Sequence, residues 1–208
     1  MIDEGSIKFR CEWIQAPPLP PEAIEEVNAW RQQLYAAGLI GFDATLQVGY
    51  GNLSVRAAQP RHFIISGTQT GKLPILTAAH YALVEDYDIA ANRVVCRGPV
   101  RASSETLTHA ALFDVTAAIQ AVVHVHHLEL WRQLRHRAPT TDERVRYGTP
   151  EMAREFRRLY VDTDFAAARI AVMAGHVAGL ISIGERLAEA AQRLLDLLPQ
   201  SRTPLVLP

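Results

Sequence analysis

Segments with the apolar spacing of strands and of helices follow one another in this chain without the regular strand–helix–strand alternation of a doubly wound fold. Alternating apolar residues predict strands, among them residues 93–96 and 121–126. Apolar residues three and four positions apart predict helices beginning at Pro21 and Pro150, and a final helix over 185–198. The fold class is therefore predicted to be α/β, with three layers around a mixed sheet.

The domain organisation follows from a change in pattern near residue 20. Residues 1–20 end in Pro17-Pro18-Leu19-Pro20 and show no sustained apolar period. We expect them to form a proline-rich arm that lies across the domain or across a neighbouring subunit. Residues 21–208 show no internal repeat and are expected to form a single domain.

Charge and cysteine content narrow the function classes. The 21 Lys and Arg residues balance 22 Asp and Glu residues, so neither nucleic acid nor a membrane surface is an expected partner. No apolar run approaches the roughly 18 residues of a membrane span, and we expect a cytoplasmic protein. Cys11 and Cys96 are far apart in the sequence, which argues against a disulfide framework or a cysteine-based zinc site. A metal site would therefore be built from histidine.

A pair of histidines alternates with valines in the predicted strand 121–126. The strand period places His124 and His126 on one face and the two valines on the other. Catalytic zinc sites often use three protein ligands, and His176, which follows a glycine in a predicted turn, is the candidate third ligand. His127 points to the opposite face and is left out. The alternative is that these are ordinary core or surface histidines, since the chain contains 8.

A second candidate site lies at a predicted helix start near residue 103. Ser103 or Ser104 is a natural N-cap there, and the unpaired backbone N–H groups of a helix start attract anions. Glu105 can act as a proton-transfer group, and His109 lies one turn further on, where it can orient Glu105. The alternative is that Ser and Glu serve only to cap the helix.

Two glycine-containing turns offer exposed amides and small hydroxyls of the kind that cradle a phosphate or a carboxylate. They span residues 49–54 and 66–72. Neither matches the phosphate-loop motif of nucleotide-binding proteins, because Leu73 stands where that motif needs Ser or Thr. Plain tight turns explain both segments equally well.

Taken in order along the chain, these motifs resemble the class II aldolase/adducin family over about residues 21–198. The motifs are Gly51-Asn52-Leu53-Ser54, Ser66-Gly67, Ser103-Ser104-Glu105, His124-Val125-His126 and Gly175-His176. The resemblance implies a three-layer α/β/α subunit with a central mixed, mainly antiparallel sheet. It also implies a homo-oligomer, usually a cyclic tetramer.

The resemblance also implies which residues bind the metal, move the proton and hold the substrate phosphate. The ligands of a divalent metal, Zn²⁺ first and Mn²⁺ or Co²⁺ as alternatives, would be His124, His126 and His176. Glu105 would be the acid/base. The substrate phosphate would lie in a phosphate cradle formed by Gly51, Asn52, Ser66, Gly67, Ser103 and Ser104.

The chain departs from the family at three places. Ser66 stands where the family's aldolases have threonine, a change that keeps the hydroxyl. Val177 follows the third histidine where the family usually has glycine, so the backbone of that turn must differ. The connection between His127 and Tyr147 is short, so no residue that reaches a neighbouring subunit's site is transferred from the family.

The resemblance implies a metal-dependent lyase that acts on a ketose or ketose phosphate. The reaction would be the reversible aldol cleavage of a small phosphorylated hydroxy-ketone through a metal-stabilised enediolate, with Glu105 moving the proton. Epimerisation, dehydration and decarboxylation remain open on the same scaffold, as does a non-catalytic interaction domain of the adducin-head type.

Overall fold

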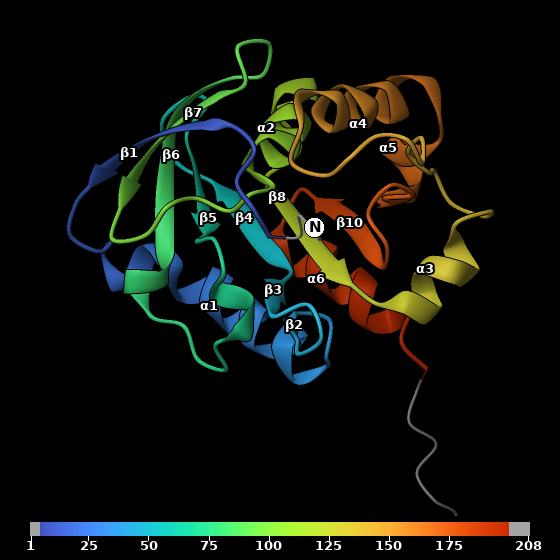
Figure 1. Ribbon diagram of the computed structural model, residues 1–208, viewed down its shortest axis with the longest axis horizontal. Coiled ribbons are helices and arrows are strands. Elements are labelled where there is room, and N and C mark those ends of the chain that lie inside the picture. Colours follow the sequence, from blue (N-terminus) through green and yellow to red (C-terminus); the bar gives the residue numbers. More distant parts are fainter. Residues whose placement is uncertain (1–4, 200–208) are drawn as a thin grey trace, which may run out of the picture.

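The computed structural model describes residues 5–199, which form a central sheet between helical layers (Figure 1). The strands of this sheet are β1 (Arg10–Gln15), β4 (Asn52–Arg56), β5 (Phe63–Ser66), β6 (Tyr81–Asp88), β7 (Arg93–Gly98), β8 (Ala121–His126), β9 (Ile170–Val172) and β10 (Gly179–Gly184). A second, two-stranded sheet pairs β2 (Gly41–Asp43) with β3 (Val48–Tyr50).

The helices are α1 (Pro21–Ala36), α2 (Thr106–Val115), α3 (Leu128–Leu134), α4 (Pro150–Asp162), α5 (Phe165–Ala168) and α6 (Leu187–Asp196). Two short 3₁₀ turns, η1 (Thr70–Lys72) and η2 (Ala78–His80), lie between β5 and β6. Within residues 5–199, every helix is too short or too polar to cross a membrane.

The eight strands of the main sheet run in the order β1-β7-β6-β5-β4-β8-β10-β9. β1 runs parallel to β7, and the other neighbouring strands of the sheet pair in antiparallel fashion. The prediction of a mixed, mainly antiparallel sheet is confirmed. β4 and β8 lie side by side in the middle, so residues from the two halves of the chain meet there.

Helices cover both faces of the sheet, which confirms the three-layer prediction. α2 and α4 pack on one face, called here the α2–α4 face, while α1 and α6 pack on the other (Figure 1). Alternation along β8 divides its side chains between the two cores: Val123 and Val125 pack with α1 and α6, whereas Val122 packs with α2 and α4. His124 and His126 therefore belong to the α2–α4 face.

The predicted helices of the first and last segments are observed because their apolar spacing buries one stripe of each helix. α1 begins with Pro21 in its first turn and is followed by Gly38, whose φ of 74° ends the helix. α6 buries Leu187, Ala190, Ala191 and Leu194 at helical spacing. The two helices pack against each other and against the sheet.

The N-terminal segment contains an edge strand that the sequence did not predict. β1 pairs with β7 over its full length, so residues 10–15 extend the sheet. The pattern shows no such strand because only one edge of β1 is paired and its partner is distant in the chain. The pairing also brings Cys11 and Cys96 together as free thiols with their Sγ atoms 3.7 Å apart.

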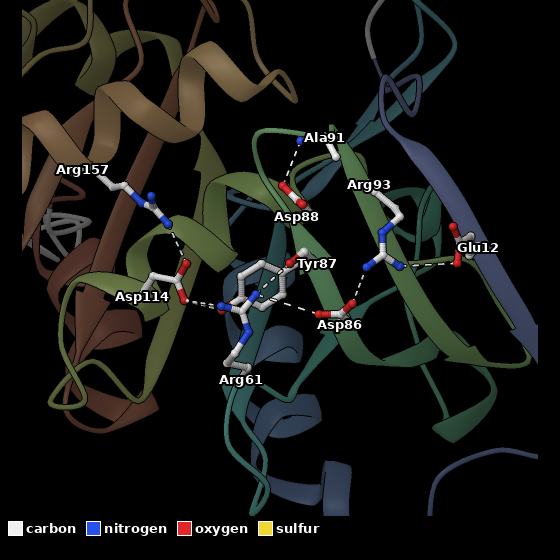
Figure 2. Close-up of polar contacts among 9 residues, drawn as sticks. All are labelled: Glu12, Arg61, Asp86, Tyr87, Asp88, Ala91, Arg93, Asp114 and Arg157. Atoms are coloured by element: carbon white, nitrogen blue, oxygen red, sulfur yellow. Dashed lines mark hydrogen bonds and ion pairs between the residues drawn. The ribbon is translucent and has the colours of Figure 1, made fainter.

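A row of alternating charges ties β1 to the rest of the subunit (Figure 2). In spatial order the row is Arg157, Asp114, Arg61, Asp86, Arg93 and Glu12. Tyr87 adds a hydrogen bond of 2.6 Å from its hydroxyl to Asp114 Oδ1. The side chains of these pairs are 22–52% exposed, so solvent screens the attraction and each pair contributes little to stability. The row spans α4, α2 and the β6–β7–β1 edge.

Candidate metal centre

β8 places two imidazoles side by side at the centre of the sheet. The Nε2 atoms of His124 and His126 lie 3.1 Å apart. His124 Nδ1 lies 3.1 Å from the carbonyl oxygen of Leu180, to which it can only donate. This bond places the ring proton on Nδ1 and leaves His124 Nε2 unprotonated, as a metal ligand requires.

The turn between β9 and β10 carries His176 to the same place. Its ring centroid lies 5.2 Å from that of His124 and 4.5 Å from that of His126. One ring nitrogen from each of the three histidines lies within 4.8 Å of the others. The prediction that these residues converge is confirmed.

The backbone of this turn shows how the chain accommodates Val177. Val177 is exposed, and the left-handed conformation falls on Ala178, with φ at 68°. Gly179 has no room for a side chain, since a Cβ there would lie 3.2 Å from His176 Nδ1 and 3.3 Å from His124 Cε1. The glycine required for close packing in this chain therefore stands at the start of β10.

The three histidines fit a divalent transition ion. Two nitrogens bound to a tetrahedral zinc at about 2.0–2.1 Å lie roughly 3.3 Å apart, close to the observed separation of the two Nε2 atoms. Burial, and then the neighbouring imidazoles, hold the pKa of His124 and that of His126 well below the usual value, so both rings are neutral. Neutral imidazole is the ligand form that zinc takes.

Glu105 lies beside this group at the start of α2. Its side chain is 2% exposed, Oε2 accepts a 3.1 Å hydrogen bond from Thr108 Oγ1, and Oε1 lies 3.6 Å from His176 Nδ1. The prediction of a serine N-cap is wrong: Glu105 occupies the N-cap position, and Ser103 Oγ accepts from the Glu105 amide at 3.3 Å. The carboxylate is thus oriented by its own helix.

His109, which was expected to orient Glu105, has a different partner. Its Nδ1 lies 2.7 Å from Ser54 Oγ on β4, and the ring is fully buried. Burial lowers the pKa of His109 to about 3, so it stays neutral. His109 lies on α2 as predicted, but its hydrogen-bond partner is Ser54 of the sheet beneath α2.

Two polar side chains of the predicted phosphate cradle, Asn52 and Ser66, lie on the neighbouring strands β4 and β5, and Ser103 and Ser104 precede α2. Asn52 is the register partner of His124, and Ser66 Oγ accepts from the Leu53 amide at 3.2 Å. Ser103 follows Ala102, which forms an isolated antiparallel bridge with Gly67. The side chains are nearly buried, with exposures of 7% for Asn52, 2% for Ser66, 4% for Ser103 and 8% for Ser104.

The two glycines of the cradle have structural explanations. The Gly67 amide donates to the carbonyl of His80 at 2.8 Å, so it is already used. Gly51 adopts a φ of 80°, and a Cβ there would lie 2.7 Å from Ile40 Cγ1. Any anion held in the cradle would therefore depend mainly on the Asn and Ser side chains.

A cavity of about 550 Å³ opens onto the histidines. Its lining includes His126, His176, Tyr50, Tyr147, Lys8 and Arg146, together with apolar side chains at the mouth. Of these six residues, only the two histidines were predicted from the sequence to be site residues. Cradle residues do not contribute to this lining.

Two tyrosines flank the histidine group. The Tyr147 ring stacks on His176 with centroids 4.5 Å apart, and the Tyr50 ring stacks on His126 at 5.2 Å. Lys8 lies over the outer face of Tyr147, with Nζ 3.0 Å from the ring centroid. Tyr50 stands inside a glycine turn already singled out, so a signal existed for it. Nothing in the pattern pointed to Lys8 or Tyr147.

Comparison of the sequence with known families gives a match to "Class II Aldolase and Adducin N-terminal domain" over residues 32–198. No match was found among curated protein sequences. The matched region contains each of the three histidines, Glu105 and the phosphate cradle.

Solved structures with similar folds include three described as aldolases or related enzymes. L-fuculose 1-phosphate aldolase has a TM-score of 0.62 and 19% identity, covering 86% of this chain and 82% of that one. A sugar-phosphate aldolase from Thermotoga maritima has a TM-score of 0.63 and 16% identity, covering 84% of this chain and 90% of that one. YgbL from Escherichia coli, whose description gives aldolase, epimerase and decarboxylase as candidate activities, has a TM-score of 0.60 and 20% identity, covering 85% of each chain. At these identities the similarity establishes the fold.

Proposed function

The chain belongs to the class II aldolase and adducin family, and on this basis we propose that it is a metal-dependent lyase. The proposed reaction is the reversible aldol cleavage of a small, phosphorylated hydroxy-ketone. The observation that carries the proposal is the convergence of three buried or half-buried histidines beside a buried glutamate. A structural core has no need of such a group, because burying it costs free energy.

His124, His126 and His176 would hold the ion, with Zn²⁺ favoured and Mn²⁺ or Co²⁺ as alternatives. A bound divalent ion supplies Lewis-acid stabilisation of the negative charge that develops on the substrate oxygens. The protein orients the ligands: the Leu180 carbonyl fixes the ring of His124, and Tyr50 and Tyr147 fix the planes of the other two.

Glu105 would move the proton on and off the substrate carbon. Thr108 holds one carboxylate oxygen, and the other faces His176, so the carboxylate has a defined orientation next to the ligands. Its burial keeps bulk water away from a carbanion-like intermediate, which water would otherwise protonate.

We propose that the phosphate cradle receives the anionic end of the substrate through Asn52, Ser66, Ser103 and Ser104, with Gly51 and Gly67 shaping the backbone around them. The pairing of Asn52 with His124 across β4 and β8 supports the proposal. Because they are nearly buried, the cradle would accept only a compact group such as a phosphate.

Replacing both Ser103 and Ser104 by Ala is expected to raise KM for a phosphorylated substrate by about tenfold or more, since each hydrogen bond to a charged group contributes about 1.5–3 kcal/mol. Ser182→Ala is a matched control, because this buried serine lies on β10 and donates to the carbonyl of Arg169, outside the cradle. Steady-state kinetics with the phosphorylated and the unphosphorylated ketose would measure the effect. An equal KM in the wild type and the double variant would refute the phosphate-binding role of the cradle. The proposed roles of the metal ligands and Glu105 would be unaffected.

Other outcomes on this scaffold remain alternatives. An epimerase, dehydratase or decarboxylase would use the same histidines and Glu105, and the description of YgbL names two of these reactions for that protein. A non-catalytic interaction domain would have no use for the buried carboxylate. We further propose a homo-oligomer, a tetramer by analogy with the family, which light scattering can measure.

The test of the reaction is a screen of short ketoses and ketose phosphates, with and without added Zn²⁺, Mn²⁺ and Co²⁺. Aldehyde release that needs the metal and favours phosphorylated substrates is the expected result. Conversion of the substrate to an isomer, a dehydrated product or CO₂ without aldehyde release would replace the lyase assignment by the corresponding alternative.

A further inference from the structure

Arg31 is a fully buried cation on α1 with no part in the mechanism above. It lies on the apolar stripe of the helix with Val27 and Leu34, and it is 1% exposed. Burying a charged side chain costs several kcal/mol unless its donors are well used. An arginine at this position, among aliphatic neighbours, therefore implies a specific role for its guanidinium.

The guanidinium is committed to one short segment, residues 70–74, which includes η1. Its Nη1 donates to the Pro74 carbonyl at 3.1 Å, and Nη2 donates to the carbonyls of Thr70 at 3.1 Å and Gly71 at 3.2 Å. The guanidinium also stacks on the Tyr35 ring at 4.6 Å. The rigid fork of arginine can hold three carbonyls at once, which the single ammonium of lysine cannot do with the same geometry.

The clamped segment is interlocked with β3. A Cβ at Gly71 would lie 2.5 Å from the Tyr50 carbonyl oxygen and 2.6 Å from the Tyr50 nitrogen. A Cβ at Gly49 would lie 3.0 Å from the Lys72 nitrogen. Backbone thus packs directly on backbone at both glycines, so a displacement of the segment would move Tyr50 with it.

Tyr50 completes the connection to the candidate metal centre. Its ring stacks on the His126 ring with an interplanar angle of 18°, and it lines the cavity. His126 is the only half-buried member of the three histidines, the other two being buried, so packing by Tyr50 is a main restraint on its ring plane.

We propose that Arg31 is a positioning residue of the metal centre: it clamps residues 70–74, which hold Tyr50 against His126. The inference rests on the proposed metal site. It predicts that loss of the clamp lowers metal affinity through Tyr50 and not through a general loss of stability.

The test is a double-mutant cycle on the affinity of the metal-free protein for Co²⁺, measured by visible absorption in competition with a chelator. Arg31→Lys and Tyr50→Leu are each expected to weaken Co²⁺ binding about tenfold, the lower end of the effect of supporting residues around metal ligands. The double variant is expected to bind no more weakly than Tyr50→Leu alone, because the two residues act in series.

Asn28→Ala is the matched control. Asn28 also lies on α1, and it holds the chain just after residues 70–74. Its side chain donates to the Leu76 carbonyl at 3.1 Å and accepts from the Tyr81 hydroxyl. This variant should lower the melting temperature but keep the wild-type affinity for Co²⁺. All affinities are to be measured at a temperature at which circular dichroism shows each variant to be folded.

Wild-type affinity in a folded Arg31→Lys protein, or additive losses in the double variant, would overturn the inference and leave the proposed function intact. If Arg31→Lys does not fold, Tyr50→Leu decides alone, because unchanged affinity there removes the link to His126. Failure of the unmodified protein to bind Co²⁺ would overturn the proposed metal site and the inference together.

Discussion

His124→Ala is expected to abolish stoichiometric binding of a divalent ion. The proposed site has three imidazole ligands, and the Leu180 carbonyl fixes the tautomer of His124. The loss of affinity should exceed the roughly 10- to 100-fold that follows removal of a residue that only supports a ligand. Metal content per subunit, measured by mass spectrometry after dialysis, would show this, and His176→Ala should behave in the same way.

His127→Ala is the control for this experiment. His127 is adjacent in sequence, but its side chain accepts from the Leu130 amide and caps α3. It should bind as much metal as the wild type, with a small loss of stability of about 1 kcal/mol from the missing cap. Full metal content in both His124→Ala and His176→Ala would refute the assignment of the ligands.

Glu105→Gln is expected to lower kcat by about 100-fold or more while keeping the metal and the fold. The amide has nearly the shape of the carboxylate and can still accept the hydrogen bond from Thr108, but it cannot exchange a proton at neutral pH. Turnover on the substrate identified by the screen, together with metal content, would separate the loss of proton transfer from a loss of ligands.

The matched control is Glu129→Gln, which removes an exposed carboxylate that contacts Gln133 and Arg132 on α3. Its turnover should equal that of the wild type. Turnover near the wild-type level in Glu105→Gln would show that Glu105 has only a structural role at the start of α2. The residue that acts as acid/base would then be unassigned.

The sequence by itself determined those features that depend on local periodicity. Alternation over residues 121–126 predicted that His124 and His126 share a face, and β8 confirms it. The helices beginning at Pro21 and Pro150 were predicted because burial of one stripe imposes a spacing that can be read along the chain. His176 was proposed as the third ligand from its place after a glycine in a predicted turn, and the family resemblance strengthened that prediction, since no local pattern joins it to the pair.

Only the tertiary structure decided which distant residues meet. The sheet order places β1 next to β7. The packing of α2 on the sheet makes Ser54, and not Glu105, the polar partner of His109. It is also the tertiary structure that places Lys8 over the Tyr147 ring. Arg31 shows the limit most clearly: its position on an apolar stripe is visible in the sequence, but its partners lie about 40 residues away. Such contacts depend on how whole elements pack, which short-range spacing does not encode.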